Sequence, residues 1–297
     1  MSRGVIAAIG AYILWGILPI YWKALQEVPA LEILCHRTVW SLAFVLFVLA
    51  IRRRWHWVAA SLRQPRTLLL FFASACLLGA NWFTYIWAVN AGHVVDASLG
   101  YFINPLISVL LGVLFLGERL RPWQGAAVVI ASAGVLYLTI SLGAFPWIGL
   151  LLAGTFGFYG LIRKTAPLGS LEGLSLETAL LTLPALAYLV ILEGAGHGAF
   201  GRAGAATTLL LAGAGAVTAF PLLLFASAAR SIALATVGIL QYIAPTLQFL
   251  LGVLVYHEPF SSARLAGFAI IWLALAIYTA DAFLHERRRR APIAAPG

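Results

Sequence analysis

The sequence predicts an all-α integral membrane protein, with ten transmembrane helices arranged as an inverted repeat of five plus five. Three observations lead to this prediction. The chain is 62% hydrophobic and only 10% charged, whereas soluble domains carry about 25% charged residues. Its apolar residues form ten continuous runs, each close to the roughly 20 residues with which a helix crosses a bilayer. The fourth and ninth of these runs also resemble each other.

The ten apolar runs define the predicted helices. In chain order they cover residues 4–23, 31–51, 68–90, 96–117, 123–141, 147–163, 174–193, 206–229, 233–256 and 264–284. A β-barrel would need alternating segments of about 10 residues, and these runs are continuous and longer. The first run is expected to remain as a helix, because a signal peptide has a shorter apolar core and a small-residue cleavage site. The predicted units are a first repeat at 1–143, a second, inverted repeat at 144–286 and a basic tail at 287–297.

The basic residues predict how the chain lies in the membrane. Loops on the cytoplasmic side carry an excess of lysine and arginine. With both termini cytoplasmic, the arginine runs at 52–54 and 287–290 lie inside, and the outside holds Lys23, Arg202 and Arg264. This distribution accounts for the net charge of +9. The expected partners are therefore the lipid bilayer and a small-molecule substrate, and nucleic acid is not expected.

Two matching runs carry the evidence for the inverted repeat. Leu99–Glu118 and Ile239–Glu258 align without a gap, so that Pro105 matches Pro245. Because each half has an odd number of helices, the second half enters the membrane from the opposite side, as in alternating-access carriers. Each proline leaves a backbone carbonyl one turn earlier without its helical partner. Two interpretations remain open: kinked helices held together by polar neighbours, or a pair of broken helices that line a substrate site.

Polar residues inside the apolar runs are the candidates for binding. Arg37 either extends back to the outer headgroups or faces the interior, where it holds an anion or pairs with an acid. Asn81 and Tyr85 lie one helical turn apart and share a helix face. Two interpretations are open for them, contacts between helices and contacts with substrate. The remaining expected binding residues are hydrogen-bonding groups and aromatic walls, namely Trp15, His36, Trp40, Tyr101, Asn104, Gln241 and Tyr242.

One acidic residue also lies within an apolar run. Glu177, in the seventh run, is the candidate for proton coupling or for pairing with Arg37. The sequence shows no metal-ligand spacing, phosphate loop or nucleophile with an oriented base, so we expect no metal and no cofactor. Small residues in the fifth and tenth runs, among them Gly134 and Gly267, suit close helix packing or a homodimer contact.

These features favour a permease for small metabolites or drugs, acting as an exporter by alternating access. Two other classes remain as alternatives. A membrane-embedded enzyme that acts on lipid intermediates would need several acid–base residues at one depth. A membrane regulator without transport would need neither the matched prolines nor polar residues in the middle of the membrane.

Three segments of the chain resemble a known family. HRTVWS at His36–Ser41, the long run Asn81–Leu120 and LQYIAPTLQFLLGV at Leu240–Val253 are similar to EamA-type transporters of the drug/metabolite transporter superfamily. The resemblance implies a bacterial inner-membrane protein whose helices 1–4 and 6–9 surround a central cavity, with helices 5 and 10 at the periphery. The superfamily includes exporters of amino acids and other small metabolites, and carriers of nucleotide sugars. It has no shared catalytic motif, so the resemblance assigns no individual contact.

Overall fold

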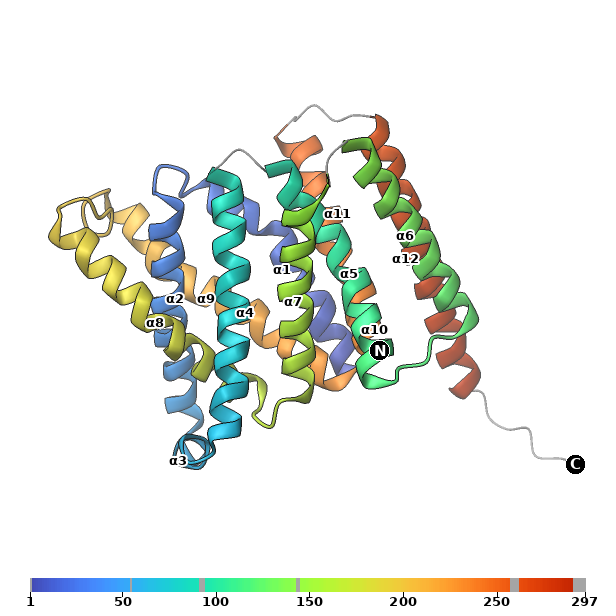
Figure 1. Cartoon of the computed structure of the whole chain (residues 1–297). Coiled ribbons are helices and arrows are strands. Elements are labelled where there is room, and N and C mark those ends of the chain that lie inside the picture. Colours follow the sequence, from blue (N-terminus) through green and yellow to red (C-terminus); the bar gives the residue numbers. More distant parts are fainter. Residues whose placement is uncertain (1, 54, 91–93, 143–144, 257–261, 291–297) are drawn as a thin grey trace, which may run out of the picture.

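The structure is a computed structural model that describes residues 2–53, 55–90, 94–142, 145–256 and 262–290. Its helices are α1 (Arg3–Lys23), α2 (Ala30–Arg52), α3 (His56–Leu62), α4 (Pro65–Asn90), α5 (Val94–Leu116), α6 (Pro122–Leu142), α7 (Trp147–Thr165), α8 (Ser170–Gly194), α9 (Ala205–Ser231), α10 (Leu234–Leu240), α11 (Ile243–Leu250), the π-helical turn η1 (Leu251–Val255) and α12 (Ser262–Arg290). The long helices alternate in direction along the chain, and α10, α11 and η1 follow one another along one axis (Figure 1).

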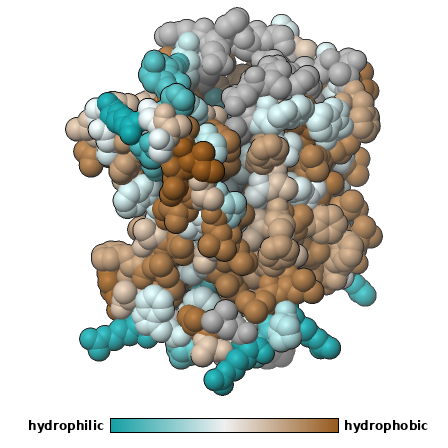
Figure 2. Space-filling model, turned by 60° about the vertical axis from the view of Figure 1, so that its left-hand side comes forward, coloured by the Kyte–Doolittle hydropathy of each residue, from teal (hydrophilic) through white to brown (hydrophobic). Residues whose placement is uncertain are grey.

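The described residues contain eight helical segments that are long and apolar enough to cross a membrane. Two predicted runs fall outside this set. The apolar part of α5, Gly100–Leu116, is shorter, and α7 ends in Arg163 and Lys164. The all-helical membrane class is therefore confirmed, and ten crossings stay a prediction. Figure 2 shows an apolar band across the middle of one face, with hydrophilic side chains at its lower edge and upper left.

Long-range packing brings helices from the two halves of the chain together. The most extensive helix pairs are α5 with α7, α6 with α12, α2 with α8 and α9, α1 with α9 and α11, α4 with α7 and α8, and α5 with α10. Helices α6 and α12 form a pair at one side of the bundle (Figure 1). The resemblance implied this peripheral position for the fifth and tenth predicted helices.

The two matched prolines lie in different local structures. Helix α5 runs without interruption through Pro105. Its counterpart is interrupted at Gln241 and Tyr242, between α10 and α11, so that Pro245 is the third residue of α11. The expectation of two broken helices is therefore wrong for Pro105. A proline inside a helix removes one backbone hydrogen bond and can kink the helix without ending it.

Helices α5 and α10 make a close contact beside the first proline. A Cβ atom added to Gly238 would lie 2.6 Å from the carbonyl oxygen of Pro105. Only a glycine allows the two backbones to approach this closely. The first matched run therefore touches the residue directly before the second.

The small residues of α6 and α12 are used within the chain. A Cβ atom added to Gly134 of α6 would lie 3.1 Å from side-chain atoms of Ile270 and Ile271 of α12. Gly267 of α12 packs against Leu138 of α6 in the same way. These glycines therefore give no support to a homodimer, for which they were one candidate surface.

Enlarging one of these glycines is expected to weaken the α6–α12 pair. Gly134→Leu should lower the thermal unfolding midpoint in detergent by several degrees, because overpacking a close contact costs about 1–3 kcal/mol. Gly125→Leu in the same helix is the matched control, since a Cβ atom there meets nothing within 4 Å. Equal midpoints for the two variants would contradict the packing described here.

Candidate functional site

A cavity of about 190 Å³ lies between the helices that surround the centre of the bundle. It takes residues from α1, α2, α4, α5, α7, α9 and α11, and from the break between α10 and α11. It brings together seven of the ten residues expected to bind substrate, namely Trp15, Arg37, Asn81, Tyr85, Tyr101, Asn104 and Gln241, and also Pro245. Their role in binding stays a prediction, but their convergence makes the cavity the candidate site.

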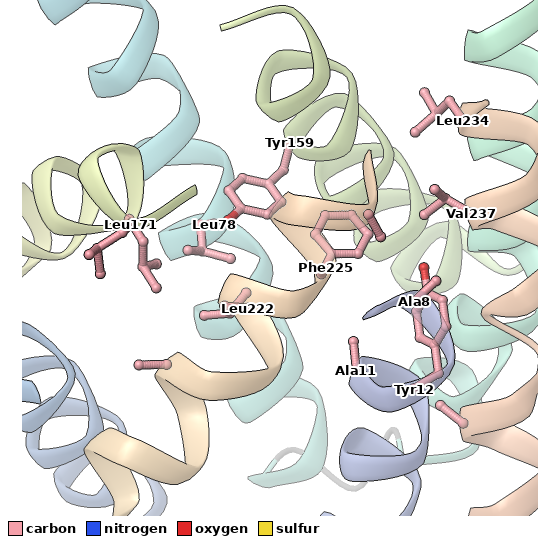
Figure 3. Packing of buried hydrophobic residues seen from close by; sticks show 14 of the residues in the cluster. Ala8, Ala11, Tyr12, Leu78, Tyr159, Leu171, Leu222, Phe225, Leu234 and Val237 are labelled. Carbon is pink, nitrogen blue, oxygen red and sulfur yellow. The ribbon is translucent and has the colours of Figure 1, made fainter. Parts of the chain in front are cut away.

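The cavity occupies the half of the bundle that lies away from the start of the chain. Its lining includes Trp22 near the end of α1, Arg37 near the beginning of α2 and Tyr85 near the end of α4. The opposite half is filled by a buried apolar cluster from α1, α2, α4, α5, α7, α8, α9, α10 and α11. Figure 3 shows part of it, with the ring of Tyr159 stacked on Phe225 at 6.0 Å. The cavity is therefore closed toward the end where the chain begins.

Arg37 supplies positive charge at the cavity wall. Its guanidinium lies 4.3 Å from the centre of the Trp82 ring and 5.3 Å from that of Trp22. Such cation–π contacts stabilise a cation out of water but do not neutralise it. Within the described part of the chain, Arg37 forms no ion pair, and its Nε atom is buried without a hydrogen-bond partner. The arrangement leaves a fixed positive charge available to an anionic ligand.

Three further polar atoms of cavity-lining residues lack partners. In the described residues, no hydrogen bond reaches Tyr12 Oη, Asn104 Oδ1 or Gln241 Oε1, although all three atoms are buried. Buried polar atoms are nearly always hydrogen-bonded in folded proteins, so each such exception needs a cause. A ligand in the cavity would supply the missing partners.

Asn81 forms an interhelical contact, and its contact with substrate stays a prediction. Its Nδ2 donates to the Leu152 carbonyl oxygen at 2.8 Å and to Thr155 Oγ1 at 3.0 Å, which joins α4 to α7. The residue also lines the cavity beside Arg37. These bonds hold the cavity wall in place, and Tyr85 and Tyr101 continue that wall with their rings 6.0 Å apart.

His36 and Trp40 do not line the cavity. The His36 ring stacks on Phe200, in the connection between α8 and α9, at 5.0 Å. Trp40 lies against the same ring at 6.0 Å, and its backbone leaves no room for a Cβ at Gly215 of α9. Residues one turn apart share a helix face, and Arg37 points about 100° away from His36 and about 60° away from Trp40. The structure therefore does not bring His36 and Trp40 to this cavity, and their contact with substrate stays a prediction.

Tyr242 is also displaced from the expected site. Its side chain is buried in the apolar core, and its hydroxyl donates to the Phe102 carbonyl oxygen at 3.2 Å. It therefore ties the break between α10 and α11 to α5. The neighbouring Gln241 faces the cavity instead.

Glu177 lies in a separate buried cluster of α4, α7 and α8. Its carboxylate accepts a hydrogen bond from Ser74 Oγ at 2.5 Å and from Tyr159 Oη at 3.4 Å. Arg163 Nη1 is 3.5 Å away, and both charged side chains are fully buried. Arg163 also donates to the carbonyl oxygens of Gly169 and Ser170. Glu177 is thus the partner of Arg163 and does not pair with Arg37.

Several cavity residues were not among the predicted contacts. The aromatic residues Tyr12, Trp22, Trp82 and Phe156 line the cavity together with Trp15. The sequence holds a signal for part of this set, since Tyr12, Trp15 and Trp22 are spaced by three and seven residues and share one face of α1. The cavity walls are thus largely aromatic, and Arg37 carries the charge of the described lining.

Carboxylate and imidazole side chains do not occur in the described lining of the cavity. Its lining includes no aspartate, glutamate or histidine among the residues with a described position. No group of three or more metal-ligating side chains was found over the same residues. The geometry that is present is suited to binding a small molecule.

Comparison with known proteins agrees with this geometry. Residues 2–140 match the EamA-like transporter family. The chain is similar to "Protein RarD" of Streptomyces exfoliatus, with 50% identity over 98% of this chain and 93% of the relative. It is similar to "Uncharacterized transporter PA0485" of Pseudomonas aeruginosa, with 45% identity over 98% of each chain. A solved structure described as "Crystal structure of protein" shares the fold, with a TM-score of 0.70 and 21% identity over 94% of this chain and 98% of that chain. The chain therefore belongs to the EamA-like transporter family of membrane proteins, with RarD among its relatives.

Proposed function

We propose that this protein is a secondary transporter that exports small amphipathic anions across the bacterial inner membrane by alternating access. The Arg37 guanidinium in the central cavity, which has no ion pair among the described residues, is the observation that carries the proposal. A buried cation is costly unless a counter-charge or water stabilises it. The surrounding rings of Trp15, Trp22 and Trp82 favour a substrate with an aromatic or apolar body.

The packing of the helices supports an inverted repeat. In such a repeat each of the first five predicted spans has a counterpart among the second five. The counterpart of α1 is α7, that of α2 is α8, that of α4 is α9, that of α5 is α10–α11, and that of α6 is α12. When each span is exchanged with its counterpart, the α1–α9 pair becomes α7–α4, α2–α9 becomes α8–α4, and α5–α7 becomes α11–α1, and all of these pairs occur. Such internal symmetry gives two related states that open to opposite sides.

The proposed orientation places both termini in the cytoplasm, as the lysine and arginine distribution indicates. The cavity then lies in the outer half of the bundle and is closed toward the cytoplasm by the apolar cluster. In an exporter this is the state that releases substrate. The absence of acid–base groups from the described lining makes an enzyme the weaker alternative, and a regulator would not need the cavity.

Efflux of loaded compounds from proteoliposomes tests the proposed function. Vesicles with purified protein are loaded with a defined mixture of carboxylic acids, amino acids, nucleosides and neutral amides, and efflux is followed by mass spectrometry. The proposal predicts protein-dependent efflux of at least one anion with an aromatic or apolar body, and no such efflux from empty vesicles. Efflux restricted to neutral compounds would reject the anion preference, and chemical conversion of a compound would indicate an enzyme.

A further inference from the structure

Two charged side chains meet at the closed end of the bundle, outside the cavity. Glu118 follows the end of α5, and Lys164 lies in the last turn of α7. Glu118 Oε1 and Lys164 Nζ are 3.7 Å apart, and their side chains are only 14% and 20% exposed. The turn that presents Glu118 depends on Gly117, whose φ of 65° is left-handed, and on a bond from Glu118 N to the Gly112 carbonyl oxygen at 3.0 Å.

Both side chains also bind the turn that joins α9 to α10. The Glu118 carboxylate accepts hydrogen bonds from the backbone N–H groups of Leu234 at 2.6 Å and Ala235 at 2.9 Å, at the start of α10. Lys164 Nζ donates to the carbonyl oxygens of Ala229 at 3.2 Å and Ile232 at 2.5 Å, at the end of α9. An anion at a helix start and a cation at a helix end both complement the helix dipole and satisfy unpaired backbone groups.

The α9–α10 turn lies between residues of α9 and α10 that close the cavity. Leu234 and Val237 of α10 belong to the apolar cluster, together with Phe225 and Ala228 of α9. Figure 3 shows Leu234, Val237 and Phe225 in this cluster. Helix α10 leads directly to Gln241 in the cavity lining. Movement of the α9–α10 turn would therefore unpack the apolar cluster and move one wall of the cavity.

We propose that Glu118 and Lys164 are positioning residues that latch the α9–α10 turn to α5 and α7, and so hold the cavity closed toward the cytoplasm. Glu118 lies in the first half of the chain, whereas Lys164 and the α9–α10 turn lie in the second. The latch thus joins the parts that alternating access would move relative to each other. This inference rests on the proposed function, because closure has a purpose only in a transport cycle.

Accessibility of an introduced cysteine tests the latch without any substrate. Ala11 of α1 is fully buried in the apolar cluster, and Ala11→Cys is placed in a Cys35→Ala/Cys76→Ala background in nanodiscs. Reaction with a charged methanethiosulfonate reagent is then measured with and without Glu118→Gln. The latch predicts about tenfold faster labelling with Glu118→Gln, since loss of charge-assisted hydrogen bonds shifts a two-state equilibrium by at least that factor.

Two further variants keep the test decisive. Arg119→Gln is the control, because it removes a neighbouring exposed charge, and labelling should stay at the rate of the parent. Lys164→Gln should accelerate labelling like Glu118→Gln, and it decides the question if Glu118→Gln is not recovered folded. Unchanged labelling in both variants overturns the latch, as does loss of folding in both. Efflux from proteoliposomes with unchanged labelling would reject the latch alone, and faster labelling without efflux of any compound would reject the transport function alone.

Discussion

Arg37→Gln is expected to abolish efflux from proteoliposomes while leaving the unliganded protein at least as stable as the parent. The first effect follows because truncation of one partner of a buried charge pair costs about 2–5 kcal/mol, which is roughly 30-fold to several thousand-fold in affinity. The second follows because Arg37 has no counter-charge among the described residues, so only its cation–π contacts with Trp22 and Trp82 offset the cost of burying the charge. Efflux rates and the thermal midpoint of the ligand-free protein measure the two effects.

Arg37→Lys is the matched control for this prediction. It keeps the positive charge but loses the planar guanidinium, which binds a carboxylate through two hydrogen bonds and stacks on indole rings. We expect efflux between that of the parent and that of Arg37→Gln. A large fall in thermal midpoint for Arg37→Gln would identify Arg37 as a structural residue and contradict the account.

Glu177→Ala is expected to be the most destabilising of the substitutions considered. It leaves the Arg163 guanidinium fully buried without its carboxylate partner, and breaking a buried pair in this way costs about 3–5 kcal/mol. It also removes the acceptor of Ser74 Oγ. Thermal unfolding in detergent should show a large fall in midpoint.

A double substitution distinguishes the effect of the Arg163–Glu177 ion pair on stability from the effect of leaving one of its charges unpaired. Arg163→Met/Glu177→Met removes both charges together and should be close to the parent in stability, because apolar replacement of a buried ion pair is often neutral or favourable. The resulting double-mutant cycle reports the coupling between the two side chains. If Glu177→Ala were as stable as the parent, the ion pair would not form in the protein.

Local signals predicted the positions of helices and of much of the cavity. Hydropathy alone marked each apolar run, because a helix in lipid must be apolar along its length. Arg37, Asn81 and Asn104 could be found because polar residues are costly in a membrane and are placed there for contacts. Pro245 marked the broken helix to within four residues of the interruption at Gln241.

Other features depended on which face of a helix meets which neighbour. His36 and Arg37 are adjacent in sequence, yet one stacks on Phe200 and the other lines the cavity. Arg163 is the last residue of the predicted run 147–163, and the structure buries it against Glu177. Glu118 directly follows the predicted run 96–117, and the backbone N–H groups that donate to its carboxylate lie more than 110 residues away along the chain. Such long-range pairing has no local sequence signature.

The central claim is that Arg37 binds the anionic group of the substrate in this cavity. It is tested most directly by removing the charge of the ligand and the charge of residue 37, separately and together. Thermal shift of the parent protein and of Arg37→Gln is measured with three carboxylates, benzoate, phenylacetate and indole-3-acetate, and with their uncharged amides. The account predicts saturable stabilisation of the parent by at least one carboxylate, at least about tenfold weaker binding of its amide, and no difference between the two in Arg37→Gln. Equal binding of carboxylate and amide by the parent, or a preference for the carboxylate that persists in Arg37→Gln, would contradict it.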